Sequence, residues 1–206
     1  MQALPFKGRV WEGMGSIVVE EHHPHPGLPL EGEGEKPGEV LRMSDVRFDD
    51  AAALLARHGL RLARVADGEP IPGSYWGESE AGIIGDTVHA RSDTPVHSLL
   101  HEAAHLIVLA PERRAAVHTD ATDSIQEEDA VCVLQALLGD ELPGVGRERV
   151  FADMDAWGYT FRLGSARAYV ERNAEAAWRW LAERGLVEPA ARTLVVARAG
   201  QVTKPG

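Results

Sequence analysis

Residues 94–111 have the sequence TPVHSLLHEAAHLIVLAP. Thr94 is a residue type that caps helices well, Pro95 suits the first helical position, and no helix breaker follows until Pro111. The sequence therefore predicts a helix over residues 96–110, and this helix carries the most specific pattern in the chain.

That pattern is an H-E-x-x-H motif, formed by His101, Glu102 and His105. Histidines four positions apart lie one turn from each other on the same face of a helix. Their neutral nitrogens can therefore bind one metal ion, and the glutamate after the first histidine can take a proton from a metal-bound water. We expect His101 and His105 to be metal ligands and Glu102 to be the catalytic base.

The composition is typical of a globular protein. The chain has 206 residues, of which 44% are hydrophobic, and a formal net charge of -11, which argues against nucleic acid or an anionic membrane as a general partner. Its single cysteine, Cys132, excludes an internal disulfide framework and fits a reducing compartment. The N-terminus has no apolar signal region. We expect a cytoplasmic protein; its oligomeric state is open.

Hydrophobic periodicity and turn residues predict the remaining elements. Helices are expected over residues 44–58, 125–138, 147–157 and 164–184, and strands over 60–65, 74–76, 81–90 and 193–196. Ser44 or Asp45 would cap the first helix, and Gly139 would end the helix that begins at 125. The predicted fold class is α+β, with a small sheet beside the H-E-x-x-H helix and a helical C-terminal part.

Three regions follow from this order of elements. Residues 1–40 are expected to be loosely structured, 41–142 to form a metal-binding α+β core, and 143–206 to form a helical part packed on that core. The aromatic residues of the last region are expected to belong to the core. They are Trp157, Tyr159, Phe161, Tyr169, Trp178 and Trp180.

A third protein ligand is expected, because two histidines alone make a weak metal site. The helix predicted from residue 125 begins with Glu127 and Glu128, about 22 residues after His105. Ser124 and Glu127 have the spacing of a capping box, which gives Glu127 a structural role and leaves Glu128 free to point elsewhere. Both acids also suit the positive end of a helix dipole. We favour Glu128 as the ligand and keep Glu127 as the alternative.

At this point the chain resembles the gluzincin class of zinc enzymes, in which a later helix supplies a glutamate to the H-E-x-x-H site. Residues 127–134 also resemble the corresponding helix of the compact bacterial ImmA/IrrE-type metallopeptidases, with Glu127 at the ligand position and Ala130 matching. The chain departs from that pattern at Val131, where the family usually has Asn or Asp. This resemblance implies a zinc peptidase acting on a peptide or protein substrate.

A second resemblance is closer over residues 97–137. The stretches His97–His105, Arg113-Arg114, Glu128-Asp129 and Gln135–Leu137 are similar to the metal-site region of elongation factor P hydroxylase. That resemblance implies a non-haem metal held by two histidines and a carboxylate, and it puts Glu128 at the carboxylate position.

Other residues are weaker candidates for the site. His97 lies one turn before His101 on the predicted helix, and His118 and Asp120 lie in the connector that follows it. Cys132 is expected to be a small buried thiol. The remaining candidates are Tyr75, Asp86, His89 and the cluster of His22, His23 and His25.

Three functions remain open from the sequence. The first is a metal-dependent hydrolase, most simply a zinc metallopeptidase with His101, His105 and Glu128 as ligands and Glu102 as the base. The second is a non-haem iron oxygenase, because two histidines and one carboxylate also form the facial triad that binds Fe(II). The third is a metal-binding module without catalysis.

Overall fold

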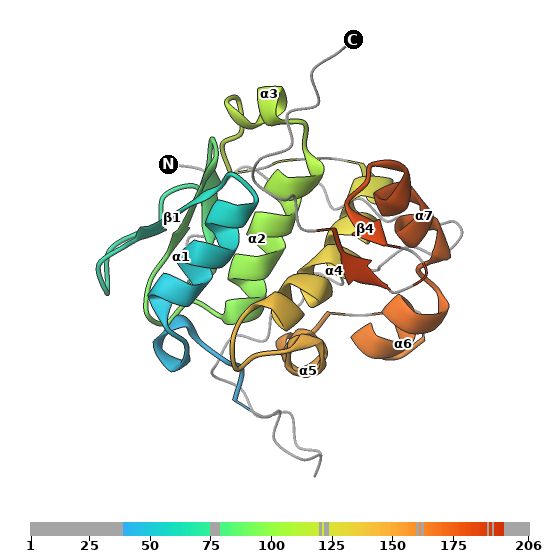
Figure 1. The fold of residues 1–206 in the computed structure, drawn as a ribbon. Helices are drawn as coiled ribbons and strands as arrows, with labels where there is room; N and C mark the ends of the chain where they lie inside the picture. Colours follow the sequence, from blue (N-terminus) through green and yellow to red (C-terminus); the bar gives the residue numbers. More distant parts are fainter. Residues whose placement is uncertain are drawn as a thin grey trace, which may run out of the picture.

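The computed structural model describes residues 39–74, 79–119, 121, 124–159, 161, 163–188, 190 and 192–195. Within these residues the chain forms a short 3-10 helix, seven α-helices and five strands (Figure 1). In chain order they are η1 (Met43–Asp45), α1 (Phe48–Arg57), β1 (Arg61–Arg64), β2 (Gly82–Ile84), β3 (Thr87–Ala90), α2 (Val96–Val108), α3 (Pro111–Arg114), α4 (Ile125–Glu141), α5 (Arg147–Trp157), α6 (Ala166–Arg172), α7 (Glu175–Glu183), β4 (Val187–Glu188) and β5 (Thr193–Leu194).

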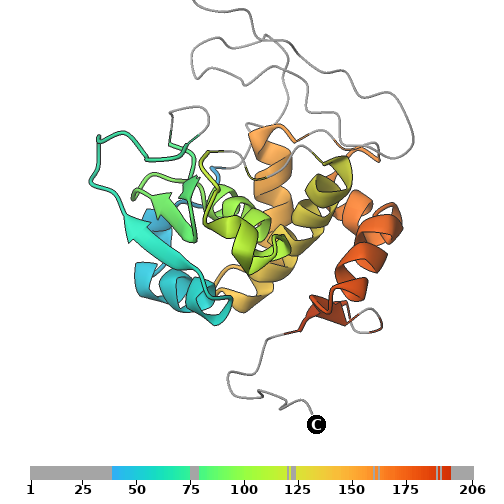
Figure 2. The same cartoon turned by 90° about the horizontal axis from the view of Figure 1, so that it is seen from above.

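The predicted α+β class is confirmed, with a small sheet beside the motif helix and helices after it. Figure 2 shows the sheet and α1 on one side of α2, and α4 to α7 on the other. The predicted N-terminal segment, with its histidine cluster, lies almost wholly outside the described residues, as do Tyr75 and Asp120. None of the helices in the described parts of the chain is long and apolar enough to cross a bilayer.

The sheet has the strand order β1-β3-β2, with β1 parallel and β2 antiparallel to β3. The strand expected over 60–65 is confirmed as β1. The single strand expected over 81–90 is wrong, because Gly85 and Asp86 form a turn that divides it into the β2–β3 hairpin. Gly85 has a φ of +61°, a conformation that glycine adopts without steric cost.

Helix α2 is the centre of the core. It packs along α4 and also contacts β2, β3 and α5. Eleven of its 13 residues are buried, and only His101 and Glu102 are partly exposed. The two residues of this helix that reach solvent therefore belong to the H-E-x-x-H motif.

The start of α2 is fixed by main-chain contacts rather than by the predicted cap. Pro95 lies just before the helix and pairs with Arg42 in an isolated β-bridge, and the Val96 amide donates to the Leu41 carbonyl. The Thr94 hydroxyl instead accepts from the Arg91 amide. The predicted cap at Thr94 is therefore wrong by one residue, and the helix ends at Val108 rather than at residue 110.

The first helix also begins later than expected. The carboxylate of Asp45 accepts from the Arg42 amide and stabilises η1, so α1 starts only at Phe48, with Arg47 at the capping position. Its expected end is confirmed, because Gly59 follows with a φ of +71° and its amide donates to the Ala56 carbonyl.

Two expectations for the later helices are wrong. The helix expected over 164–184 is divided into α6 and α7 at Asn173 and Ala174. Gly139 does not end α4, which continues to Glu141. The helix expected over 147–157 is confirmed as α5.

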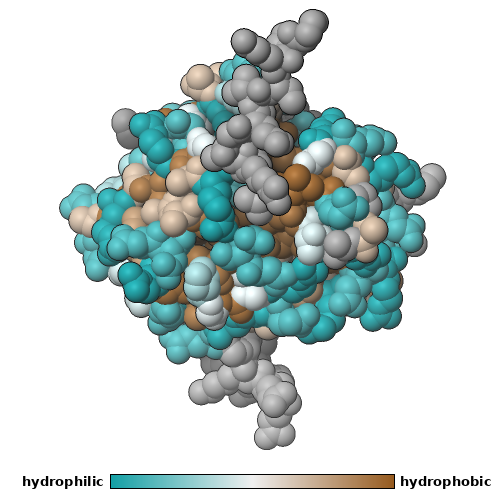
Figure 3. Space-filling view, viewed as in Figure 1, coloured by the Kyte–Doolittle hydropathy of each residue, from teal (hydrophilic) through white to brown (hydrophobic). Residues whose placement is uncertain are grey.

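The expected aromatic core is confirmed for Phe161, Tyr169, Trp178 and Trp180, which are all buried. Hydrophilic residues cover most of the face seen in Figure 3, with hydrophobic residues between them. Among the described residues the only large hydrophobic side chains classed as exposed are Leu163 and Val195.

Gly139 lies where α4 meets α5, and its missing side chain allows this contact. A Cβ atom there would lie 2.5 Å from Val150 Cγ2 and 3.2 Å from the Gly146 carbonyl oxygen. Gly139→Ala should therefore destabilise the protein by about 1–2 kcal/mol despite the higher helix propensity of alanine, because a valine in a helix has little χ1 freedom to move away. Urea unfolding would measure this, and Val150→Ala in the same chain should recover part of the loss. A more stable Gly139→Ala protein would contradict the packing.

Candidate metal centre

Helices α2 and α4 bring three of the predicted site residues together. His101 and His105 lie on one face of α2, with their Nε2 atoms 3.1 Å apart. Glu128, in the first turn of α4, places Oε1 3.4 Å from His101 Nε2 and Oε2 3.4 Å from His105 Nε2. One ligand atom from each residue lies within 4.8 Å of the others, so a single ion can be reached by all three.

Gln135, two turns further along α4, orients the first histidine. Its amide nitrogen donates to the His97 carbonyl oxygen at 2.8 Å, so its amide oxygen faces His101 Nδ1 at 3.2 Å. The Nδ1–H group of His101 therefore donates to Gln135, and the Nε2 atom of His101 points toward Glu128 and His105. Metal-binding histidines commonly have this arrangement, in which a hydrogen bond to one ring nitrogen fixes the tautomer of the other.

The electrostatics of the three side chains favour a positive charge between them. Burial opposes the charged form of His101, but the hydrogen bond and attraction from Glu128 outweigh it and raise the pKa of His101 to about 9. Burial and the neighbouring His101 lower the pKa of His105 to about 4. Burial favours the neutral acid at Glu128, yet the two histidines lower its pKa to about 2. In the metal-free protein a proton on His101 supplies the charge that a metal ion would supply when bound.

The donor set fits a divalent transition metal. Two imidazole nitrogens and one carboxylate oxygen are the ligands of catalytic zinc sites and of the iron facial triad, and both leave positions open for other ligands. The Glu128 side chain is 39% exposed whereas the two histidines are below 16%, so solvent reaches the group from the side of Glu128. The hydrogen bonding around the ligand group is incomplete at one atom, because His105 Nδ1 is buried without a hydrogen-bond partner in the described structure.

Glu102 lies beside the ligand group. It follows His101 in α2, is partly buried, and contributes to raising the pKa of His101 by its negative charge. A carboxylate next to the first histidine can accept a proton from a molecule held between the ligands.

Glu127 points in a different direction from Glu128. Its amide donates to the Ser124 hydroxyl at 3.4 Å, which is half of the predicted capping box, and its carboxylate lies 3.6 Å from Arg113 Nη1. Glu127 therefore faces the connector that contains α3. Among the described residues it is not part of the ligand group.

The weaker candidates lie elsewhere. His118 is exposed, pairs with Ile84 in a β-bridge, and its Nδ1 lies 2.8 Å from the Thr119 hydroxyl. Cys132 is a buried free thiol, as expected, and burial raises its pKa. Asp86 lies in the β2–β3 turn, where it pairs with Arg61, and His89 lies in β3.

The His97 side chain is neither exposed to solvent nor hydrogen-bonded to the main chain. Its ring is 1% exposed, and both ring nitrogens lack a hydrogen-bond partner in the described structure. It contacts the rings of Trp157 and Tyr159 at centroid distances of 5.2 and 5.9 Å. Burial and the neighbouring His101 lower its pKa to about 3, so His97 is neutral at ordinary pH.

Two residues that contact the site, Gln135 and Tyr159, are not among those predicted from the sequence. Gln135 served only as a point of resemblance, although a fully buried amide in an apolar stretch of helix indicates a specific hydrogen-bond partner. Tyr159 was assigned to the core, yet its ring packs edge-on against His101 with centroids 6.1 Å apart. Its position could not be found from sequence, because it follows α5 and reaches α2 only through the packing of these helices.

Comparison with models of known protein families, with curated proteins and with solved structures gave no match to this chain. The site is therefore interpreted from its own geometry and chemistry.

Substitution of Gln135 tests whether its hydrogen bond to His101 contributes to metal affinity. Gln135→Met preserves side-chain length but removes both hydrogen bonds, so His101 is no longer held in one tautomer. Zinc affinity should fall by roughly 10–100-fold, the range typical of such outer contacts. Gln126→Met, at an exposed position of the same helix, is the matched control and should leave the affinity unchanged. Equal affinities of the two variants would show that Gln135 does not orient the ligand.

Proposed function

We propose that this protein is a metal-dependent hydrolase of the zinc metallopeptidase type, with His101, His105 and Glu128 as metal ligands and Glu102 as general base. The observation that supports this proposal most strongly is the ligand group, in which the Nε2 atoms of two histidines and a carboxylate oxygen lie within 4.8 Å of one another. The position of Glu102 beside His101 on an otherwise buried helix favours hydrolysis over simple metal storage, because ligation alone does not need this carboxylate.

A bound Zn²⁺ would supply Lewis acidity toward water and toward the carbonyl of a peptide bond. The residues of the chain would position the ligands, balance the charge of the ion and transfer protons. Gln135 accepts from the Nδ1–H group of His101 and so directs Nε2 toward the ion, and the negative charge of Glu128 offsets part of the charge on the ion. Glu102 accepts a proton from the attacking water and donates it to the departing amine.

A non-haem Fe(II) oxygenase is the second candidate. It is supported by the same set of two histidines and one carboxylate, and by the resemblance of residues 97–137 to elongation factor P hydroxylase. In that case Glu102 would contact the substrate rather than activate water. The two candidates share the ligands and differ in the metal and in the role of Glu102.

The ligand assignment predicts different results for two adjacent glutamates. Glu128→Gln should lower zinc and Fe(II) affinity by more than the roughly 10–100-fold effect of an outer contact, as should His101→Ala and His105→Ala. Glu127→Gln is the matched control and should leave the affinity within about threefold, with a loss of stability of about 1 kcal/mol or less. Metal titration with a competing chelator would measure both. A larger loss in Glu127→Gln would replace Glu128 by Glu127 as ligand.

The role of Glu102 separates the two chemistries. Glu102→Gln should retain one zinc ion per chain but lower hydrolysis of a fluorogenic peptide library by about 10²–10⁴-fold, because the amide cannot accept the proton of water. Wild-type protein loaded with zinc is the reference, and protein loaded with Fe(II) is assayed for oxygen consumption. Zinc-loaded wild-type protein without peptide hydrolysis, together with oxygen consumption by the iron form, would overturn the hydrolase in favour of the oxygenase.

A further inference from the structure

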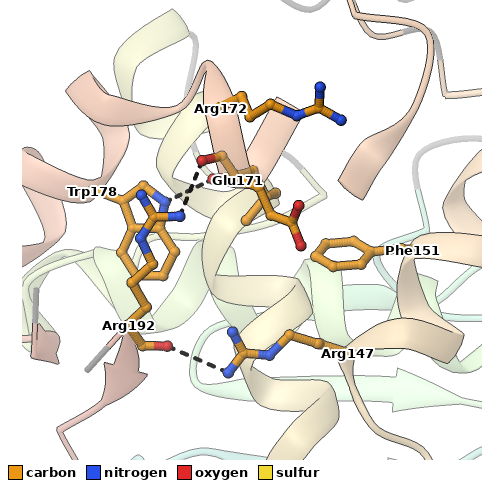
Figure 4. A pocket seen from close by; sticks show the side chains of 7 residues that line it. Arg147, Phe151, Glu171, Arg172, Trp178 and Arg192 are labelled. Atoms are coloured by element: carbon orange, nitrogen blue, oxygen red, sulfur yellow. Dashed lines mark hydrogen bonds between the residues drawn. The ribbon is translucent and has the colours of Figure 1, made fainter. Parts of the chain in front are cut away.

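A pocket lies near the end of α4 opposite to the ligand group. It has a volume of about 380 Å³, within the range of small-molecule sites (Figure 4). Asp140, which pairs with one of its arginines, follows Glu128 by 12 residues and so lies about 18 Å from it along α4. Its lining residues are Arg147, Phe151, Val170, Glu171, Arg172, Trp178 and Arg192.

Two arginine side chains form one wall and are held in place by the protein. Arg147 donates from Nε to Asp140 at 2.5 Å and from Nη2 to the Arg192 carbonyl at 3.3 Å. Arg192 donates from Nη1 to the Glu171 carbonyl at 3.1 Å, and its guanidinium lies 5.4 Å from the centre of the Trp178 ring. Arg147 Nη1 and Arg192 Nη2 have no partner within the described residues. These preorganised guanidinium groups therefore retain donors for an anionic group.

The opposite wall carries a negative charge. The carboxylate of Glu171 extends into the space beside Phe151 (Figure 4). Within the described residues this carboxylate has no hydrogen bond or ion pair, although three guanidinium groups, those of Arg147, Arg172 and Arg192, line the same pocket. The pocket thus presents separate positive and negative walls that do not neutralise each other by direct contact.

Apolar surface lies between the charged walls. Phe151, Val170 and Trp178 contribute it, and Trp178 is fixed by a hydrogen bond from its indole nitrogen to the Val170 carbonyl at 2.9 Å. A ligand with an apolar portion can therefore bury it here while its charged groups reach the two walls.

The backbone at Arg192 supports a role for this side chain in binding. Arg192 has a φ of +50°, in the left-handed region where glycine is favoured and an L side chain has a steric cost. The chain nevertheless has an arginine there, and its guanidinium lies over Trp178 inside the pocket.

We propose that this pocket binds a free α-amino acid with an apolar side chain. The carboxylate of the ligand is bound by Arg147 and Arg192, its ammonium group by Glu171, and its side chain lies against Phe151 and Trp178. The lining carries three guanidinium groups and one carboxylate, so a ligand with both a negative and a positive group can pair with lining residues of both signs. This site is separate from the metal centre and does not depend on the proposed hydrolase.

The test uses three related ligands and the indole N–H resonance of Trp178 as a reporter in ¹⁵N-labelled full-length protein. L-Leucine should shift this resonance saturably. N-acetyl-L-leucine, which lacks the ammonium group, and L-leucinamide, which lacks the carboxylate, should bind at least tenfold more weakly. The absence of a saturable shift with L-leucine, or equal binding of all three ligands, would overturn the proposal.

Substitutions of Glu171 and Arg192 test which lining residue binds each charged group of the ligand. Glu171→Gln should weaken L-leucine binding about tenfold and leave N-acetyl-L-leucine unaffected. Arg192→Gln should weaken both, and Arg192→Lys should recover part of the loss. Glu175→Gln and Arg179→Gln, at exposed positions of α7 outside the pocket, are the matched controls.

If Glu171→Gln strengthens the binding of N-acetyl-L-leucine until it equals the binding of L-leucine to the wild-type protein, the pocket is a simple anion site and the proposal fails. If Arg192→Gln does not fold, the comparison of the three ligands still decides.

Discussion

The packing of α2 against α4 is the constraint on which the rest of the structure depends. Each helix alone carries only part of the ligand group: the two histidines lie on α2 and the carboxylate on α4. The apolar faces of the two helices hold the group together, because nearly every residue of α2 and most residues of α4 are buried. Gln135 adds a polar contact in this apolar interface by bonding both to the main chain and to His101 of α2.

The same packing lowers the stability of the folded protein when no metal is bound, because it buries the polar groups of the site. Burying imidazole and carboxylate groups is unfavourable unless they are paired, and the metal-free protein pairs them through a proton on His101. A divalent ion would replace this proton and be bound by all three side chains. Stability and metal binding are therefore linked, because an ion that binds only the folded chain stabilises it.

The parts of the fold that were predictable from sequence are those with local signals. The stretch without a breaker between Pro95 and Pro111 predicts α2, and the capping position of Ser124 gives Glu127 a role different from that of Glu128. The α6–α7 break had no comparable signal. The Val170 and Glu171 carbonyls near the end of α6 accept from Trp178 and Arg192, and the second of these is distant in sequence. Gly139 is predicted to end a helix but lies inside α4, because the feature that requires a glycine there, the close approach of α5, is a tertiary contact.

One divalent ion should bind between His101, His105 and Glu128. Crystals of the protein loaded with one equivalent of zinc, measured on both sides of the zinc absorption edge, test it most directly. The account predicts a single anomalous peak per chain, at about 2.0–2.2 Å from Nε2 of both histidines and from a Glu128 carboxylate oxygen. A peak that lies elsewhere, or a site bound by Glu127 in place of Glu128, would contradict it.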